Sequence, residues 1–207
     1  MFIKFCGFTR FEDLEFAVSL PITAVGFIFY KNSKRYIEPQ KAINLINYAK
    51  EKGKLTVGIF VEKDSKLIEE IALFLKLDYL QLYFHKNIEN LEKKFNIIYA
   101  YRINLYDDLK NIKIPKEKNL LLLDSFHKSE FGGTGKTFNW KLLKNLPYLN
   151  KTIIAGGINE NNIQELLSLI SPMGIDVSSG IEISPGIKSR EKMSNLINKI
   201  LEVKDHE

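Results

Sequence analysis

The chain has 207 residues, of which 45% are hydrophobic and 27% charged, as in a globular protein long enough for one well-buried domain and short for two. Its net charge of +5 comes from lysines interspersed with acidic residues, so we expect a solvated surface and no nucleic-acid partner. The single cysteine, Cys6, excludes an internal disulfide, and no apolar run is long enough for a membrane span.

We expect a cytoplasmic protein without a metal site. The one cysteine and the lack of a signal-peptide pattern in the first residues fit a reducing compartment. The histidines at positions 85, 127 and 206 are scattered and lack the spacing of metal ligands. A mild positive field would still assist the capture of an anionic small molecule.

Strand-like and helix-like segments alternate along the chain. The periodicity predicts strands at 2–6, 22–29, 55–61, 78–82, 97–103, 119–124, 151–155 and 174–177. Helical patterns lie between them at 11–19, 39–51, 65–76, 87–95, 138–146, 160–170 and 189–202. The stretch 104–118 is polar and contains Pro115, which predicts that the fifth helix is weak or short.

Eight strand–helix units in one chain favour a closed (β/α)8 TIM barrel, an α/β fold, over an open sheet. Most predicted strands are continuous apolar runs, which is typical of parallel strands buried on both faces. No linker or low-complexity stretch divides the chain, so residues 1–207 are predicted to form a single compact domain. In such a barrel the active site forms at the carboxyl ends of the strands.

Three glycine clusters follow predicted strands in the last third of the chain. They are Gly132-Gly133-Thr134-Gly135, Ala155-Gly156-Gly157 and Ser178-Ser179-Gly180. A glycine turn between a strand and a helix lets backbone N–H groups approach a phosphate closely. We therefore expect the mouth of the barrel to hold a phosphorylated small molecule.

Cys6 and Asp124 end the first and the sixth predicted strands, which lie three steps apart around an eight-stranded ring. They should therefore face each other across the mouth of the barrel. A thiol at a positive, phosphate-binding mouth could have a pKa low enough for it to act as a base. An aspartate buried at the end of an apolar strand requires a partner. The alternatives are a small core residue for Cys6 and a turn cap for Asp124.

Two further charged residues are candidates for substrate contact. Arg35 lies in the long loop after the second strand. Its guanidinium group either binds a substrate carboxylate through two N–H groups or is a solvated loop charge. Asp176, inside the last strand, either accepts hydrogen bonds from substrate hydroxyls or forms an internal ion pair. The sequence favours neither interpretation of Asp176.

Nine motifs stand in order along the chain. They are KFCGFTR at 4–10, EDLEFAV at 12–18, AVGFIFYKNSKRYI at 24–37, VGIFV at 57–61, LDYLQL at 77–82, LLLDS at 121–125, GGTGKTFNW at 132–140, AGGIN at 155–159 and DVSSGIEISPGIK at 176–188. In order and spacing this set resembles the N-(5′-phosphoribosyl)anthranilate isomerase family of tryptophan biosynthesis. The resemblance covers nearly the whole chain.

The resemblance implies an Amadori rearrangement of a phosphoribosyl substrate, with no metal and no cofactor. Asp124 would be the general acid that protonates the ribose ring oxygen, and the Cys6 thiolate would be the general base that removes the C2′ proton. Arg35 would meet the anthranilate moiety, and Asp176 would contact the ligand or orient the site. The residues whose backbone would hold the phosphate are Gly133, Gly156, Gly157, Ser179 and Gly180.

The end of the fourth strand departs from the family's pattern. The family usually reads QLHG there, whereas this chain reads QLYF, so Tyr83 replaces a histidine near the substrate. Tyrosine keeps an aromatic ring and a hydrogen-bond donor but carries no positive charge near neutral pH. We expect Gln81 and Tyr83 to belong to the substrate-binding wall.

Two alternative functions share the same barrel. An aminoimidazole-carboxamide sugar-phosphate isomerase of histidine synthesis would pair two aspartates, and Cys6 argues against it. A non-catalytic phospho-ligand sensor is left a small opening by Tyr83, and the presence of both Cys6 and Asp124 argues against it. The sequence leaves a monomer and a homodimer open.

Overall fold

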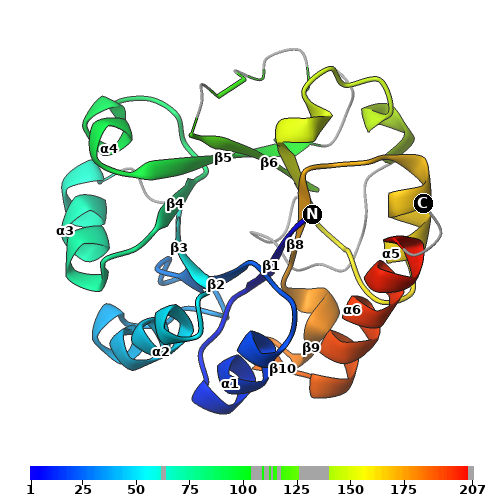
Figure 1. The fold of residues 1–207 in the computed structure, drawn as a ribbon. Helices are drawn as coiled ribbons and strands as arrows, with labels where there is room; N and C mark the ends of the chain where they lie inside the picture. Colours follow the sequence, from blue (N-terminus) through cyan, green and yellow to red (C-terminus); the bar gives the residue numbers. More distant parts are fainter. Residues whose placement is uncertain are drawn as a thin grey trace.

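The structure is a computed structural model that describes residues 1–61, 64–103, 109, 112, 114–115, 118–125 and 140–204. Eight parallel strands pair in the order β1-β2-β3-β4-β5-β6-β7-β8 and close into a barrel through the pairing of β1 with β8. Helices surround the barrel on its outside (Figure 1). The predicted (β/α)8 architecture is confirmed.

Each barrel strand lies within two residues of its predicted span. The strands are β1 Phe2–Cys6, β2 Ala24–Ile28, β3 Leu55–Phe60, β4 Tyr79–Leu82, β5 Asn96–Ile103, β6 Leu120–Ser125, β7 Thr152–Ala155 and β8 Gly174–Val177. Apolar runs therefore located the strands correctly, because parallel strands buried on both faces need apolar side chains on both faces.

The α-helices agree less closely with the predicted spans. They are α1 Phe11–Ser19, α2 Pro39–Glu51, α3 Ser65–Leu75, α4 Glu89–Lys94, α5 Ile163–Leu169 and α6 Arg190–Lys204. Three 3₁₀-helices also occur among the described residues, at Trp140–Leu143 (η2), Leu149–Lys151 (η3) and Ser179–Ile181 (η4). A short antiparallel hairpin of β9 Glu182–Ser184 and β10 Ile187–Lys188, which was not predicted, follows η4.

Two of the predicted helices differ from the structure for local reasons. In the described part of the predicted helix 138–146, only Trp140–Leu143 is helical, as the 3₁₀-helix η2, and Pro147 disfavours helical backbone at the residue before it. Helix α5 begins only at Ile163, because the side chains of Asn159 and Asn162 bond nearby backbone N–H groups at 2.9 Å. The weak or short fifth helix predicted within 104–118 falls largely outside the described residues.

Alternation of side chains along the strands divides the apolar residues into two clusters. The larger lies between the barrel and the helices and contains Phe5 and Phe27. The smaller fills the barrel interior and contains Cys6, Ala24, Val57, Ile59, Ile98, Ala100, Leu122, Ile153 and Ala155. Lys4 and Cys6 share the inward face of β1, so a lysine is fully buried inside the barrel.

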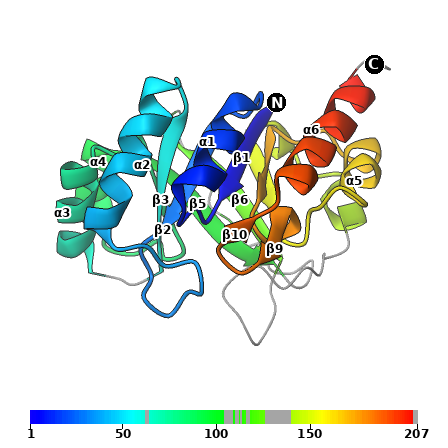
Figure 2. The ribbon, with the colours of Figure 1, turned by 90° about the horizontal axis from the view of Figure 1, so that it is seen from below.

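The two ends of the barrel differ in what they carry. The start of β1 and the end of α6 lie near one end, and the loop between β2 and α2 and the β9–β10 hairpin lie at the other (Figure 2). The second end is where the carboxyl ends of the strands emerge, which is the end that bears active sites in this architecture. Among the described residues, no helix combines the length and the apolar composition needed to cross a membrane.

The seam between β8 and β1 leaves no room for a side chain at Gly174. A methyl group there would lie 2.2 Å from the carbonyl oxygen of Phe2, its partner across the seam. We therefore expect Gly174→Ala to lower the free energy of unfolding, measured by urea denaturation, by about 3 kcal/mol.

Gly53→Ala is the matched control for the seam. Nothing lies within 4 Å of the added methyl group, so only the positive φ of 71° opposes the substitution. We expect this backbone strain to lower the free energy of unfolding by about 1 kcal/mol. An equal loss of stability in the Gly53 and Gly174 variants would contradict a tight seam.

Candidate active site

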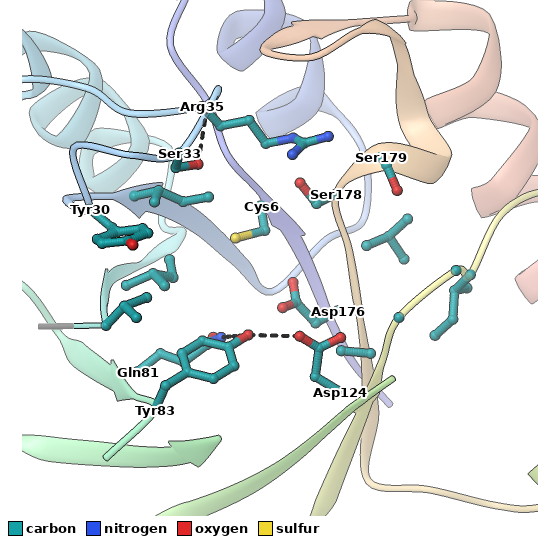
Figure 3. Close-up of a pocket in the computed structure, with 18 residues that line it drawn as sticks. Cys6, Tyr30, Ser33, Arg35, Gln81, Tyr83, Asp124, Asp176, Ser178 and Ser179 are labelled. Atoms are coloured by element: carbon teal, nitrogen blue, oxygen red, sulfur yellow. Dashed lines mark hydrogen bonds between the residues drawn. The ribbon is translucent and has the colours of Figure 1, made fainter. Parts of the chain in front are cut away.

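A pocket lies over the carboxyl ends of the strands, and most of the site residues expected from the sequence line it (Figure 3). Its polar and glycine lining includes Cys6, Tyr30, Ser33, Arg35, Gln81, Tyr83, Asp124, Gly156, Gly157, Asp176, Ser178 and Ser179. Strands β1 and β6 thus bring Cys6 and Asp124 into one pocket. Gly180 is not part of the lining, and Gly133 lies outside the described residues.

A buried ion pair lies beside Cys6. Lys4 on β1 and Asp176 on β8 are partners in the parallel register, and Lys4 Nζ is 2.7 Å from Asp176 Oδ2. Burial lowers the pKa of Lys4, but the charge of Asp176 and the nearby Cys6 together hold that pKa above its ordinary value. Lys4 is therefore a permanent cation, and the internal ion pair considered for Asp176 is present.

Burial raises the pKa of the Cys6 thiol above its ordinary value. The charge of Asp176 acts in the same direction, while Lys4 and Lys188 oppose both effects. The sequence suggested a lowered thiol pKa at a positive mouth, and the structure differs because the side chain is only 4% exposed. A side chain at Gly26 would approach Cys6 Sγ to 2.7 Å, so this glycine makes space for the thiol.

Asp124 is a carboxyl group that holds its proton unusually strongly. Burial raises its pKa to about 6, the hydroxyl of Tyr83 opposes this by hydrogen bonding, and the charge of Asp176 adds to the rise. The Tyr83 hydroxyl donates to Asp124 Oδ2 at 3.0 Å. A carboxyl group with such a pKa can donate a proton near neutral pH, as a general acid must.

Tyr83 is itself held by two neighbours. The side-chain amide of Gln81 donates to the Tyr83 oxygen at 3.3 Å, which forms a chain from Gln81 through Tyr83 to Asp124 (Figure 3). The guanidinium of Arg102 lies over the tyrosine ring, 5.2 Å from its centroid. Arg102 on β5 is also the register partner of Asp124 on β6, so these side chains form one cluster.

Arg35 is held by a carboxylate that the sequence analysis did not assign. Its Nε and Nη2 donate to Glu182 of β9 at 2.9 and 2.7 Å, and the guanidinium is buried. A solvated loop charge is therefore excluded. A side chain at Gly7, whose φ is +81°, would approach Arg35 Cδ to 2.8 Å, so the glycine permits this close approach.

Glu182 also pairs with Lys188, which joins the hairpin to the base of the pocket. Lys188 Nζ lies 2.8 Å from Glu182 Oε1 and also donates to the backbone carbonyls of Cys6 and Ser178. Hydrogen bonds from Arg35 and Lys188 hold the pKa of Glu182 below its ordinary value despite its burial. In the sequence, Glu182 and Lys188 stand on either side of a Ser-Pro-Gly turn, and this pattern is the signal that could have predicted the cluster.

Two of the three glycine corners meet in the structure. Gly156 and Gly157 have φ values of 90° and 68°, which suit glycine. A methyl group at Gly180 would lie 1.9 Å from the carbonyl oxygen of Ile158, so the loops after β7 and β8 touch through their backbones. These corners, with Ser179, form one side of the pocket. The described residues contain no cluster of three or more metal-ligating acids, histidines or cysteines.

A family model and a curated relative match almost the whole chain. The model of N-(5′-phosphoribosyl)anthranilate (PRA) isomerase matches residues 3–199. The N-(5′-phosphoribosyl)anthranilate isomerase of Thermoanaerobacter pseudethanolicus is 40% identical over 200 residues, covering 96% of this chain and 97% of that protein. The chain belongs to this family. The family consists of isomerases of tryptophan biosynthesis, so the chain is an enzyme.

Solved structures of the same isomerase family have the same fold. The enzyme of Thermotoga maritima is 31% identical, with a TM-score of 0.85 over 98% of this chain and 99% of that chain. A second structure, 28% identical with a TM-score of 0.82, covers 98% of this chain and 99% of the other. That phosphoribosylanthranilate isomerase is in complex with reduced 1-(o-carboxyphenylamino)-1-deoxyribulose 5-phosphate.

The raised pKa of Asp124 should destabilise this isomerase at neutral and alkaline pH. The pKa is 3.8 in the reference state and about 6 in the folded protein, so the folded state binds the proton more tightly. Stability is therefore lost as pH rises from the lower pKa through the higher one. We expect Asp124→Asn to unfold with a free energy up to about 3 kcal/mol higher than the wild type at about pH 8.

At about pH 5 the difference in free energy of unfolding between Asp124→Asn and the wild type should fall to about half, because Asp124 of the folded wild type then keeps its proton. Urea denaturation at both pH values measures the difference. A variant that is less stable than the wild type by the same amount at both values would contradict the raised pKa.

Proposed function

We propose that this chain isomerises N-(5′-phosphoribosyl)anthranilate to 1-(o-carboxyphenylamino)-1-deoxyribulose 5-phosphate, with Asp124 as general acid and Cys6 as general base. The observation that carries the proposal is the pocket that contains both side chains. Membership of the isomerase family supports the reaction, and the pKa of about 6 for Asp124 supports its role as the proton donor.

The first step opens the ribose ring. Asp124 transfers its proton to the ring oxygen, and the bond between C1′ and this oxygen breaks with its electron pair moving to the oxygen. The lone pair of the anthranilate nitrogen forms a double bond to C1′, which gives a protonated Schiff base. Asp124 ends the step as a carboxylate, which accepts the hydrogen bond from Tyr83.

The second step moves the double bond along the sugar. The Cys6 thiolate removes the proton from C2′, the released electron pair forms a C1′–C2′ double bond, and the imine electrons return to nitrogen. The resulting enolamine tautomerises to the ketone. A thiol with a raised pKa is a stronger base once ionised, and the Lys4 and Lys188 charges favour the thiolate.

The other residues of the pocket hold the two ends of the substrate. The phosphate binds the backbone at Gly156, Gly157 and Ser179, which line the pocket, and at the adjacent Gly180. Gly133, which lies outside the described residues, is a further proposed phosphate contact. Arg35 binds the anthranilate carboxylate through the guanidinium N–H groups that do not donate to Glu182.

The middle of the substrate meets polar atoms without partners. Asp176 Oδ1, Ser178 Oγ and Gln81 Oε1 are buried and have no hydrogen-bond partner among the described residues. Buried polar atoms of this kind require hydrogen bonds, which the ribose hydroxyls supply here. Asp176 and Gln81 are thus the substrate-binding residues of the sugar, and Tyr83 completes their wall.

Removing the acid or the base should stop turnover without unfolding the protein. We expect Cys6→Ala and Asp124→Asn each to lower kcat by at least about 10³-fold, which is within the range of one positioned proton transfer. The loss of substrate fluorescence measures turnover, and urea denaturation checks that each variant is folded.

The same assay separates this isomerase from its alternatives. Wild-type kcat in both the Cys6 and the Asp124 variants would contradict the mechanism. A wild-type protein that binds the reduced product analogue but never turns over phosphoribosylanthranilate would be a ligand sensor. A preference for the aminoimidazole-carboxamide substrate of histidine synthesis, offered side by side, would reassign the substrate.

A further inference from the structure

We propose that Tyr83 is a positioning residue for the general acid: its hydroxyl fixes Oδ2 of Asp124, so that Oδ1 is the oxygen that delivers the proton to the substrate. This inference rests on the proposed role of Asp124 in the isomerisation. It concerns a residue at which this chain departs from the pattern of its family, since tyrosine stands where a histidine is usual.

The direction of the hydrogen bonds supports this role. The amide of Gln81 can only donate through its Nε2, so at 3.3 Å it occupies a lone pair of the Tyr83 oxygen. The single hydroxyl hydrogen of Tyr83 is then left for Asp124 Oδ2, 3.0 Å away. Figure 3 shows the chain of three side chains, in which the second oxygen of Asp124 points away from Tyr83.

The surroundings keep the tyrosine in this place. Gln81 is 1% exposed and Asp124 4% exposed, so both ends of the chain are fixed in the barrel interior. The Arg102 guanidinium covers the ring of Tyr83 and belongs to β5, the strand between β4 and β6. Tyr83, the first residue after β4, is therefore held against Asp124 by side chains of β4 and β5.

A phenol supplies this hydrogen bond at every pH at which the enzyme would work. Burial, followed by the charges of Asp124 and Asp176, raises the pKa of Tyr83 well above its ordinary value, so the hydroxyl keeps its hydrogen. A histidine titrates near neutral pH, and its charge would change the acid beside it. Tyr83 instead stabilises the carboxylate that forms when the proton leaves, independently of pH.

The direction of the pKa change in a variant follows from this bond. The Tyr83 hydroxyl lowers the pKa of Asp124 against the larger effect of burial. Tyr83→Phe removes the donor and keeps the ring, so the pKa of Asp124 should rise above its value of about 6. The proton would then leave less readily, and the acid would also lose its fixed orientation.

The test compares Tyr83→Phe with Tyr79→Phe. Tyr79 is the first residue of β4, the strand that Tyr83 directly follows. It packs against the same interior cluster and is not part of the pocket lining, so its variant loses a tyrosine hydroxyl outside the site. We expect Tyr83→Phe to lower kcat about tenfold, as for one hydrogen bond to a charged group, with KM changed less than about twofold. Tyr79→Phe should keep the wild-type kcat and KM.

A second readout reports on the acid directly. Difference infrared spectroscopy follows the C=O stretch of the protonated carboxyl group against pH, and Asp124→Asn identifies the band by removing it. We expect the midpoint of this band to move up by about one pH unit in Tyr83→Phe and to stay in place in Tyr79→Phe. Tyr83→His restores a donor and should return kcat to within about threefold of the wild type.

The outcomes separate this inference from the proposed function. If Tyr83→Phe matches Tyr79→Phe in kcat and in the infrared midpoint, or changes KM alone, the positioning role is wrong while Asp124 can still be the acid. If Asp124→Asn keeps wild-type turnover, the proposed mechanism fails whatever Tyr83→Phe does. Should Tyr83→Phe fail to fold, a folded Tyr83→His whose kcat is lowered about tenfold or more despite the restored donor would overturn the inference.

Discussion

The pairing of β1 with β8 is the constraint on which the pocket depends. It closes the barrel and, in the same register, places Lys4 opposite Asp176 as a buried ion pair. Removing two charges from water is costly, and such a pair is seldom the most stable filling of a core. Its presence next to Cys6 is explained by what it does to the neighbouring groups, because Lys4 and Asp176 both act on the thiol.

The same pair divides the pocket electrostatically. Lys4 and Lys188 lie on the side of Cys6 and favour the charged thiolate. Asp176 faces Asp124 and favours the protonated carboxyl group there. Burial still raises the pKa of both groups, and at Cys6 the two lysine charges only oppose part of that rise. Different charged neighbours, lysines at the thiol and a carboxylate at Asp124, are what distinguish the proposed base from the proposed acid.

Sequence patterns predicted the frame of this site better than its chemistry. Apolar runs gave the strands, and the rule that active sites form at their carboxyl ends placed Cys6 and Asp124 in one pocket. The Glu182 cluster was missed because Glu182 meets Arg35 across 147 residues, through a short hairpin without a strong local signal. The direction of the Cys6 pKa was missed because it depends on the depth of burial, which charge near in sequence does not reveal.

Cys6 and Asp124, the proposed base and acid, are held by separate networks of the same kind. Glu182 and Lys188 connect the loops after β1, β2 and β8, and the backbone of Cys6 accepts a hydrogen bond from Lys188. On the other wall, Gln81 and Tyr83 of the β4 segment hold Asp124 of β6. Each group is therefore fixed from a strand or loop other than its own. The proposed proton transfers require both groups to stay within hydrogen-bond reach of one sugar, and closure of the barrel keeps the two walls at a fixed separation.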